Sequence, residues 1–271
     1  MSRAQWTSDK LFSRLLTNKT KKGYWDAITA LRARASEEVY ERAVRLARSD
    51  NERDKIVGID VLAQLGQTPR MRQDKTVSLY FELLSQPSSP KVLSSLLSGI
   101  GHNNDKLTGE QISILSAYAD HSYSAVRFAL VHALLGLEHP DAIVMLICLS
   151  RDTHGDVRNW ATFGLGSQIE VTTDEILYAL LERTTDNHAD TKLEAIVGLA
   201  ERKDVRVKQI MLDELQKGAH GSLLFEAIEI LGDKDFLMPL EGIMNSLNND
   251  REVNPEWRMA LEEVVVKLRE G

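Results

Sequence analysis

Aromatic and acidic side chains at regular spacing are the residues of this sequence best suited to bind another molecule. Trp160 and Phe163 lie three residues apart, Glu194 follows Trp160 by 34 residues, and Glu226 follows Glu194 by 32. Large aromatic side chains are common anchors at protein interfaces, and grouped carboxylates favour a basic or amine-bearing partner. We therefore expect a binding surface made of Trp160, Phe163, His132, Glu194, Glu226 and Glu229.

Patterns typical of a catalytic or metal centre are absent from the sequence. There is no HExxH, GxSxG, CxxC or GxxxxGK[ST] string. His154, His188 and His220 recur at intervals of 34 and 32 residues, too far apart along repeated elements to share one zinc ion, whose ligands lie at ~2 Å. The single cysteine, Cys148, lies in the apolar run 142–149 and is expected to be a small core residue. We expect no catalytic residue, no metal and no cofactor.

The elements that position these side chains follow from an internal repeat. Positions 31 to 38 residues apart share one pattern, in which an aliphatic residue stands seven places later; they are Tyr24, Lys55, Leu93, Arg127, Arg158, Lys192, Leu224 and Arg258. Apolar residues at offsets of one, four and seven from these positions form one face of a helix. Small residues such as Gly58 and Ala161 stand between them and permit close helix approach.

A second set of amphipathic stretches alternates with these helices. The stretches are roughly 3–17, 36–48, 72–85, 109–119, 140–151, 173–184, 204–217 and 234–248. Thr108 with Gln111 and Thr172 with Glu175 fit a capping box, and glycines are expected to end helices at positions 66, 101, 136, 166 and 232. The chain is therefore predicted to be all-α, with about sixteen helices in eight antiparallel pairs and a single domain over 1–271.

The repeat resembles the HEAT-repeat family, especially the short HEAT-like repeats of bilin-lyase-type proteins. The residues that match best are Asp156, Val157 and Arg158 with Leu165, and Val126 with Arg127 and Leu134. The resemblance covers nearly the whole chain. It implies a right-handed α-solenoid, a superhelix of the HEAT or armadillo type, whose second helices line a concave binding face. It also implies that Asp156, Arg158 and Arg127 stabilise turns and the packing between repeats.

The fifth repeat departs from the others at the face that binds partners in such folds. Asn159 and Thr162 are polar where other repeats have apolar residues, whereas Trp160 and Phe163 are aromatic where others are polar or small. One interpretation is that both rings protrude as a binding anchor. The other is that this helix is rotated and that both rings pack into adjacent repeats.

Charge is divided unevenly along the chain. Residues 1–100 carry 17 Lys and Arg against 11 Asp and Glu, a balance of +6, while the whole chain has a net charge of −7. Residues 101–271 are therefore strongly acidic, which suggests surfaces with different partners or head-to-tail association. Carboxylates such as Asp54 and Asp60 are expected to solvate helix faces. The absence of an apolar leader segment and of paired cysteines suggests a soluble cytoplasmic protein.

These observations favour a non-catalytic protein-binding scaffold or adaptor. The expected partner is a protein that is basic where it meets the carboxy-terminal part, with neither nucleic acid nor membrane as a partner. A first alternative is an enzyme similar to the HEAT-like alkylpurine glycosylases, using Trp160, Phe163 and Glu194 or Glu229; the acidity of the chain opposes phosphate binding. A second alternative is a chaperone subunit of the bilin-lyase type.

Overall fold

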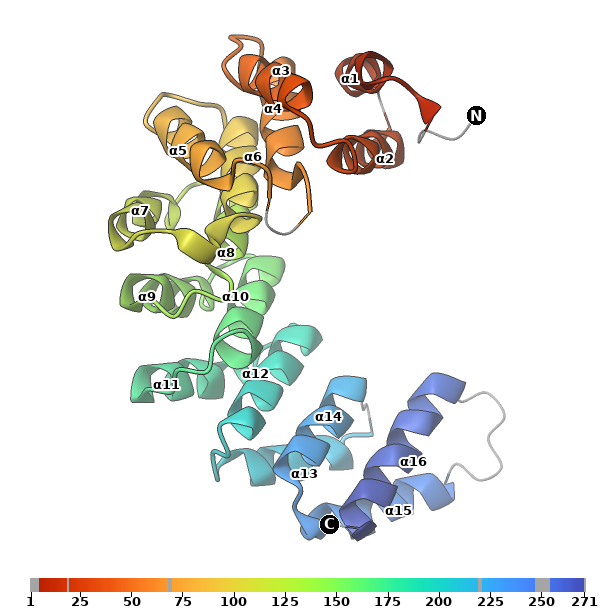
Figure 1. Cartoon of the computed structure of the whole chain (residues 1–271). Helices are drawn as coiled ribbons and strands as arrows, with labels where there is room; N and C mark the ends of the chain where they lie inside the picture. The colour runs from red at the N-terminus through yellow and green to blue at the C-terminus, as the bar shows by residue number, and fades with distance from the viewer. Residues whose placement is uncertain (1–4, 19, 68–69, 219–220, 247–253, 271) are drawn as a thin grey trace. The chain divides into compact units, whose positions relative to one another are not determined.

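The computed structural model describes residues 5–18, 20–67, 70–218, 221–246 and 254–270. Within these residues the chain forms sixteen α-helices and no β-strand (Figure 1). The backbone divides into two compact units, an amino-terminal unit of residues 1–142 and a carboxy-terminal unit of residues 143–271. Each unit is described by itself below.

The amino-terminal unit consists of four helix pairs. Its helices are α1 (Ser8–Thr17), α2 (Lys21–Arg32), α3 (Glu37–Ala47), α4 (Glu52–Gln64), α5 (Gln73–Leu84), α6 (Pro90–Gly101), α7 (Gly109–Leu115) and α8 (Ser124–Leu134). Short 3₁₀ turns occupy Asn104–Lys106 and Ser116–Tyr118. The second helix of each pair packs on the second helix of the next pair, so that α2, α4, α6 and α8 form one row.

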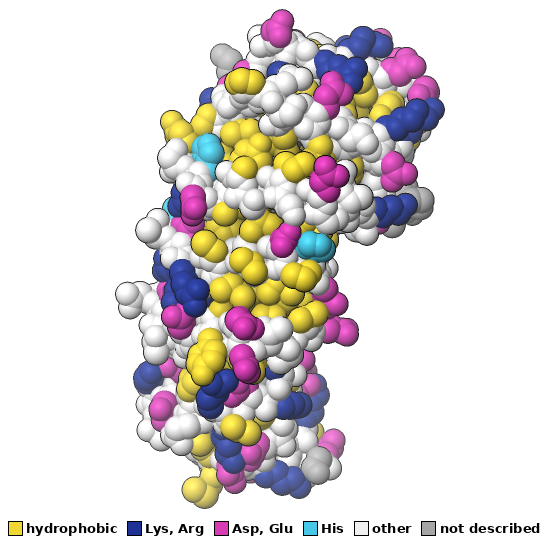
Figure 2. Space-filling model, turned by 90° about the vertical axis from the view of Figure 1, so that its left-hand side faces the viewer, with side chains coloured by type: hydrophobic (Ala, Val, Ile, Leu, Met, Phe, Trp, Pro, Cys, Tyr) yellow, Lys and Arg dark blue, Asp and Glu magenta, His cyan; other side chains and the backbone are white. Residues whose placement is uncertain are grey.

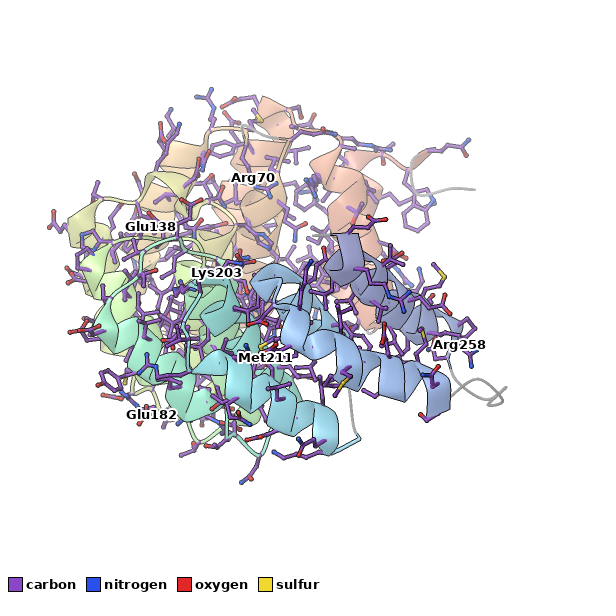
Figure 3. All side chains as sticks on the ribbon, turned by 90° about the horizontal axis from the view of Figure 1, so that it is seen from below. Arg70, Glu138, Glu182, Lys203, Met211 and Arg258 are labelled. Atoms are coloured by element: carbon purple, nitrogen blue, oxygen red, sulfur yellow. The ribbon has the colours of Figure 1, made fainter. Side chains whose placement is uncertain are left out.

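The carboxy-terminal unit repeats this arrangement. Helix α9 (Pro140–Leu149) crosses the boundary, and it is followed by α10 (Gly155–Ser167), α11 (Asp174–Arg183), α12 (Ala189–Glu201), α13 (Val207–Gln216), α14 (Ser222–Leu231), α15 (Leu237–Ser246) and α16 (Pro255–Glu270), with a 3₁₀ turn at Lys234–Phe236. Here α10, α12, α14 and α16 form the row. The core lies between the helices: Met211 of α13 is fully buried, whereas Glu182 of α11 lies at the outer edge (Figure 3).

The repeat explains where the second helices begin. The position that recurs every 31 to 38 residues in the sequence, such as Arg127 or Arg158, is the fourth residue in seven of these eight helices and the third in α14. The side chains at an offset of three are buried in α2, α10, α12 and α14 alike, and those at an offset of seven are buried in α2, α10 and α12, so a stripe of small and aliphatic residues faces the core. The prediction of sixteen helices in an all-α fold is therefore confirmed for the described residues.

Two small residues set a close helix crossing in the carboxy-terminal unit. A Cβ atom added at Gly198 of α12 would lie 2.5 Å from the Cα of Gly166 in α10. Gly166 and Gly101 were expected to follow their helices in the left-handed conformation. Gly101 is instead the last residue of α6, Gly166 lies one residue before the end of α10, and neither has a positive φ, so the expected conformation is wrong for both. The predicted left-handed conformation does occur at Gly66, Gly136 and Gly232. The two helical glycines instead permit close contact between backbones.

One predicted cap is confirmed and one is wrong. Thr108 and Gln111 form the expected capping box at the start of α7. At α11 the cap is Thr173, whose hydroxyl accepts from the backbone N–H of Ile176, rather than Thr172. Both threonines carry the same capping group, so the choice between them depends on where the preceding turn ends.

Candidate functional site

The row of second helices in the carboxy-terminal unit carries five of the predicted binding residues. Trp160 and Phe163 lie on α10, Glu194 on α12, and Glu226 and Glu229 on α14. Trp160 and Glu194 are each the sixth residue of their helix, and α10, α12 and α14 pack in sequence order. Repeated helices in a row turn the same face toward the same side, so the repeat itself brings these residues onto one face.

The two aromatic residues form a contact with each other. Their ring centroids lie 5.6 Å apart with an interplanar angle of 82°, an edge-to-face arrangement. Trp160 is 36% exposed and Phe163 is half-buried. Thr162 is fully buried, and its hydroxyl donates to the carbonyl of Arg158 at 2.7 Å. Helix α10 thus buries the same stripe as its neighbours, with the polar group of Thr162 satisfied by its own backbone.

An acidic cavity lies next along the row, between α12, α14 and α16. It has a volume of about 320 Å³ and four glutamates in its lining, Glu201, Glu226, Glu229 and Glu263. Phe225 and Val264 supply apolar walls, and Phe225 packs against Trp257 with ring centroids 5.2 Å apart. Lys267 forms an ion pair with Glu229. The carboxylates outnumber this cation, so the cavity favours a positively charged group.

Glu194 is the most perturbed carboxyl group of this face. Its pKa is raised to about 7, chiefly by burial and also by the nearby charges of Glu226 and Asp190. A carboxyl group with this pKa is partly protonated at neutral pH. A cation placed beside it would favour the ionised form, so the group couples binding of a cation to release of a proton.

His132 belongs to the amino-terminal unit. It lies on α8, half-buried, with its ring edge-to-face on Phe128 at a centroid distance of 4.8 Å. Burial lowers its pKa, so the neutral imidazole is favoured. The candidate site therefore consists of residues of the carboxy-terminal unit alone.

The two arginines of the repeat make the same hydrogen bond. Nη1 of Arg127 donates to the carbonyl of His121 at 2.6 Å, and Nη1 of Arg158 donates to the carbonyl of Asp152 at 2.9 Å, six residues earlier in both cases. Arg158 also binds Asp186 in the next turn through Nε and Nη2, at 2.8 and 2.9 Å. Such contacts close a turn and join neighbouring repeats.

Asp156 has different surroundings. Its side chain is exposed in the first turn of α10, where its carboxylate lies 3.8 Å from the imidazole of His154. The acidic residue that pairs with Arg158 is Asp186, whose side chain is only 4% exposed. The resemblance emphasised Asp156, and sequence reasoning missed Asp186, although it stands two residues before His188 as Asp152 stands two before His154.

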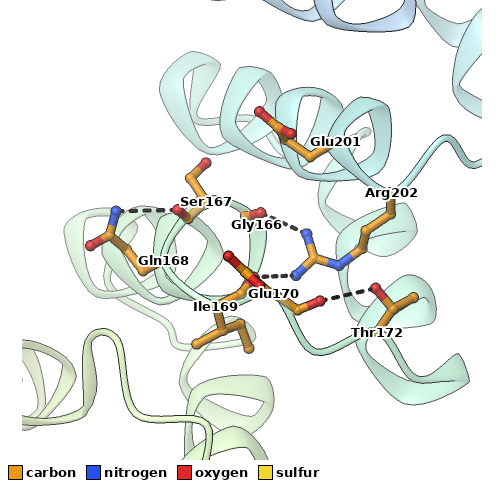
Figure 4. A pocket seen from close by; sticks show the side chains of 8 residues that line it. All are labelled: Gly166, Ser167, Gln168, Ile169, Glu170, Thr172, Glu201 and Arg202. Carbon is orange, nitrogen blue, oxygen red and sulfur yellow. Dashed lines mark hydrogen bonds between the residues drawn. The ribbon is translucent and has the colours of Figure 1, made fainter.

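A larger cavity, of about 520 Å³, lies at the carboxyl end of α10 (Figure 4). Arg202 crosses it: Nη1 donates to the carbonyl of Gly166 at 2.6 Å, and Nη2 donates to those of Leu165 at 2.6 Å and Ile169 at 3.0 Å. The last carbonyls of a helix lack partners within the helix. Arg202 donates hydrogen bonds to these carbonyls and thereby caps the helix. The sequence pattern did not indicate this role.

Cys148 is exposed, so the prediction of a small core residue is wrong. It lies on the outer side of α9, close in sequence to Val144, which is also exposed. Figure 2 faces the side of the first helices and shows hydrophobic side chains at the surface there. An apolar run that is long relative to one helical turn must place some of its residues on the outer face.

The described residues also contain no cluster of three or more His, Cys, Asp or Glu side chains arranged to hold a metal ion. His154 and His188 lie at the amino-terminal caps of α10 and α12, whereas His220 lies outside the described residues. In the same part of the chain, every helix is too short or too polar to traverse a lipid bilayer.

Comparison with known proteins shows a similarity to the YibA proteins of Escherichia coli. The chain is 34% identical to protein YibA of Escherichia coli K12 over 125 residues, with the same figures for YibA of Escherichia coli O157:H7. This match covers 46% of the chain and 44% of each YibA protein, so it spans less than half the length of these curated relatives. No protein-family profile matches the chain.

The whole chain nevertheless superposes on a solved structure. The X-ray structure of Escherichia coli YibA aligns with a TM-score of 0.76 at 23% identity, over 99% of this chain and 94% of the YibA chain. At this identity the likeness establishes a shared fold. Together with the rows of stacked helix pairs, it fits a HEAT-like repeat protein.

Proposed function

We propose that this protein is a non-catalytic scaffold, a right-handed superhelix of HEAT-like repeats that binds a basic segment of a partner protein in the cytoplasm. The binding face is the row of second helices in the carboxy-terminal unit. The observation that carries the proposal is the acidic cavity of about 320 Å³. Its lining includes Glu201, Glu226, Glu229 and Glu263, which come from the neighbouring second helices α12, α14 and α16. Repeat proteins commonly use such rows as extended binding surfaces.

The geometry supports a division of roles between the two parts of this face. A Lys or Arg side chain would enter the cavity, where Phe225 and Val264 contact its methylene groups and the carboxylates contact its charge. Trp160, 36% exposed on α10, would supply the apolar anchor. The same carboxylates repel phosphate, which argues against a nucleic-acid enzyme. The chaperone role of the bilin-lyase type stays a prediction.

Binding of a labelled peptide tests the proposal. The probe is a short fluorescein-labelled peptide rich in Lys and Arg with one central Leu, and its binding is followed by fluorescence anisotropy. Replacing both Glu226 and Glu229 with Gln should weaken binding about tenfold. Trp160→Ala should weaken it less, about threefold. The exposed Glu256→Gln serves as a matched control on α16 and should leave binding unchanged.

The pH dependence gives a second measurement. A bound cation favours ionised Glu194, whose pKa is about 7 in the free protein, so affinity should rise between pH 6 and pH 8 and this rise should be smaller in Glu194→Gln. Equal affinity of the wild type and the Glu226→Gln, Glu229→Gln double variant would refute binding in this cavity. Equal affinity for a neutral peptide of the same length would refute recognition by charge.

A further inference from the structure

The amino-terminal unit has a cavity that the sequence pattern did not indicate. It has a volume of about 540 Å³ and lies between the start of α2 and the first three turns of α4. Lys21, Tyr24 and Trp25 of α2 and Arg53 and Asp60 of α4 line it. Its lining therefore combines two cations and two aromatic rings with one carboxylate, unlike the acidic cavity of the other unit.

A partly buried hydrogen-bond network lies at the base of this cavity. The hydroxyl of Tyr24 donates to Oδ2 of Asp60 at 2.6 Å, and the hydroxyl of Ser95 donates to Oδ1. Burial raises the pKa of Tyr24 far above its ordinary range, so the phenol remains a donor. Sequence analysis placed Asp60 on a solvated face, but its two oxygens are held by hydroxyls from α2 and α6. The network fixes the ring of Tyr24.

Two further side chains are positioned on that ring. The guanidinium of Arg53 lies over it, 5.3 Å from the centroid, and its Nη2 donates to the carbonyls of Leu15 at 2.6 Å and Asn18 at 2.9 Å. Trp25 packs edge-to-face on Tyr24 with centroids 5.4 Å apart, and it remains 41% exposed. The indole of Trp25 and the guanidinium of Arg53 are thus held in place before any ligand binds. This lowers the entropic cost of ordering side chains on binding.

The charges indicate the chemistry of a ligand. Asp60 uses both oxygens within the protein, while Lys21, at the first position of α2, is exposed and forms no ion pair with any acidic side chain among the described residues. The flanking sequence is basic, with a balance of +6 over residues 1–100. A carboxylate would lie between Lys21 and Arg53. A phosphate is less suited, because Nη2 of Arg53 is occupied and Asp60 is near.

We propose that the cavity lined by Lys21, Trp25 and Arg53 binds an acidic peptide segment of a partner protein, in which a Glu or Asp next to an apolar residue is recognised. The carboxylate pairs with Lys21 and Arg53, and the apolar side chain packs on the indole of Trp25. This site lies in the other unit from the acidic cavity and does not depend on the function proposed above.

The experiment uses the full chain and a defined peptide. The probe is a short acetylated and amidated peptide of Glu and Asp residues around a central Leu-Phe pair, labelled with fluorescein and followed by anisotropy. Saturable binding is expected, and a peptide with Gln and Asn in place of the acids should bind at least tenfold more weakly. Trp25→Ala should weaken binding about tenfold and Lys21→Glu at least fivefold.

Control variants separate this site from general charge effects. Lys75→Glu changes an exposed lysine of α5 in the same unit and should bind the peptide within twofold of the wild type. Because Lys21 is exposed, Lys21→Glu keeps the test valid even if Trp25→Ala fails to fold. The proposal is overturned if the acidic peptide does not bind, if the neutral peptide or inorganic polyphosphate binds equally well, or if both site variants bind normally. Self-association of the wild type that Trp25→Ala abolishes would also overturn it.

Discussion

The two units use the same scaffold but present opposite charges on their rows of second helices. In the amino-terminal unit, the cavity at Trp25 has two cations in its lining, and its single carboxylate, Asp60, accepts hydrogen bonds from Tyr24 and Ser95. In the carboxy-terminal unit, four glutamates line the cavity beside α14. Residues that face the core are alike in both rows, so the difference lies in the side chains that face solvent. The fold determines where a ligand can bind, and the solvent-facing side chains determine which charge that ligand carries.

The units also differ in where the glycine with the least room for a Cβ atom lies. In the amino-terminal unit a Cβ atom at Gly58 of α4 would lie 2.2 Å from the backbone nitrogen of Ala47, at the carboxyl end of α3. In the carboxy-terminal unit the close approach, at Gly198 and Gly166, joins two second helices, α12 and α10. The first contact therefore joins helices within a pair, and the second joins one pair to the next.

The largest effects are expected from adding a methyl group at these two crossings. Gly58→Ala and Gly198→Ala should each destabilise the chain by about 3 kcal/mol, because the new Cβ meets backbone atoms rather than mobile side chains. Urea unfolding measures the loss. Gly242→Ala on α15 is the control, because a Cβ there meets no atom within 4 Å, and it should be neutral or slightly stabilising.

Hydrogen exchange shows whether the units respond separately. Gly58→Ala should speed exchange mainly in residues 5–142, and Gly198→Ala mainly in residues 143–270. If either substitution speeds exchange equally in both ranges, the two units unfold as one and the comparison between them does not extend to stability.

A smaller loss is expected at the ion pair between repeats of the carboxy-terminal unit. Arg158→Ala should cost about 2 kcal/mol, since it leaves the carboxylate of Asp186 without its main partner while that side chain is 4% exposed. The hydrogen bonds from Arg158 lower the pKa of Asp186. The pair therefore stabilises the fold above the unfolded pKa of ~3.9, and this contribution is lost as the pH falls through the lower folded value.

Unfolding by urea from pH 6 down to pH 2.5 tests this dependence. The wild type should lose more stability than Arg158→Ala over this range. Arg127→Ala is the counterpart in the amino-terminal unit. Because it leaves the Arg158–Asp186 pair intact, its stability should fall with pH as much as that of the wild type. Parallel curves for the wild type and Arg158→Ala would show that the ion pair contributes little.

The smallest effects are expected from the two perturbed groups near neutral pH, and they have opposite signs. The raised pKa of Glu194 means that its ionised form destabilises the folded state, so Glu194→Gln should add ~1 kcal/mol at pH 8 after allowance for its partial exposure, and nothing at pH 4. The lowered pKa of His132 means that stability is lost as the pH falls below ~6.5.

The pH dependence should therefore differ between the units. From pH 8 to pH 5, residues packed on Glu194 should gain protection from hydrogen exchange while those packed on His132 lose it. Glu262→Gln, an exposed position on α16, is the control for Glu194→Gln. A gain of stability at pH 8 in this control would show that general charge repulsion, rather than the burial of Glu194, is responsible.

The helices could be predicted from the sequence because each repeat carries the same apolar stripe. Leu134 stands seven residues after Arg127 in α8, and Leu165 stands seven residues after Arg158 in α10. The residues between them follow one pattern in both helices. Burial of such a stripe drives helix pairing whatever the outer residues are. The same reasoning placed Trp160, Glu194 and Glu226 on successive helices of one row.

The polar contacts between repeats were not predictable in this way. Asp60, Asp186 and Arg202 owe their roles to neighbours 28 to 37 residues away, and a periodic pattern does not say which polar side chain faces which. Cys148 was misplaced for a related reason, since an apolar run shows that a helix is buried without showing which residues face outward. Tertiary packing decides both questions.

The hydrogen bonds of Arg127 and Arg158 to carbonyls six residues earlier have a consequence for how such chains can change. In both cases the donor and the acceptor belong to the same helix pair. The hydrogen bond that closes the turn is therefore copied whenever that pair is duplicated. A chain that gains or loses another complete pair keeps these two bonds, whereas the bonds from Arg158 to Asp186 join two pairs and require that both remain. Evolution and protein engineering can therefore lengthen or shorten this protein by whole repeats while keeping the turns that Arg127 and Arg158 close.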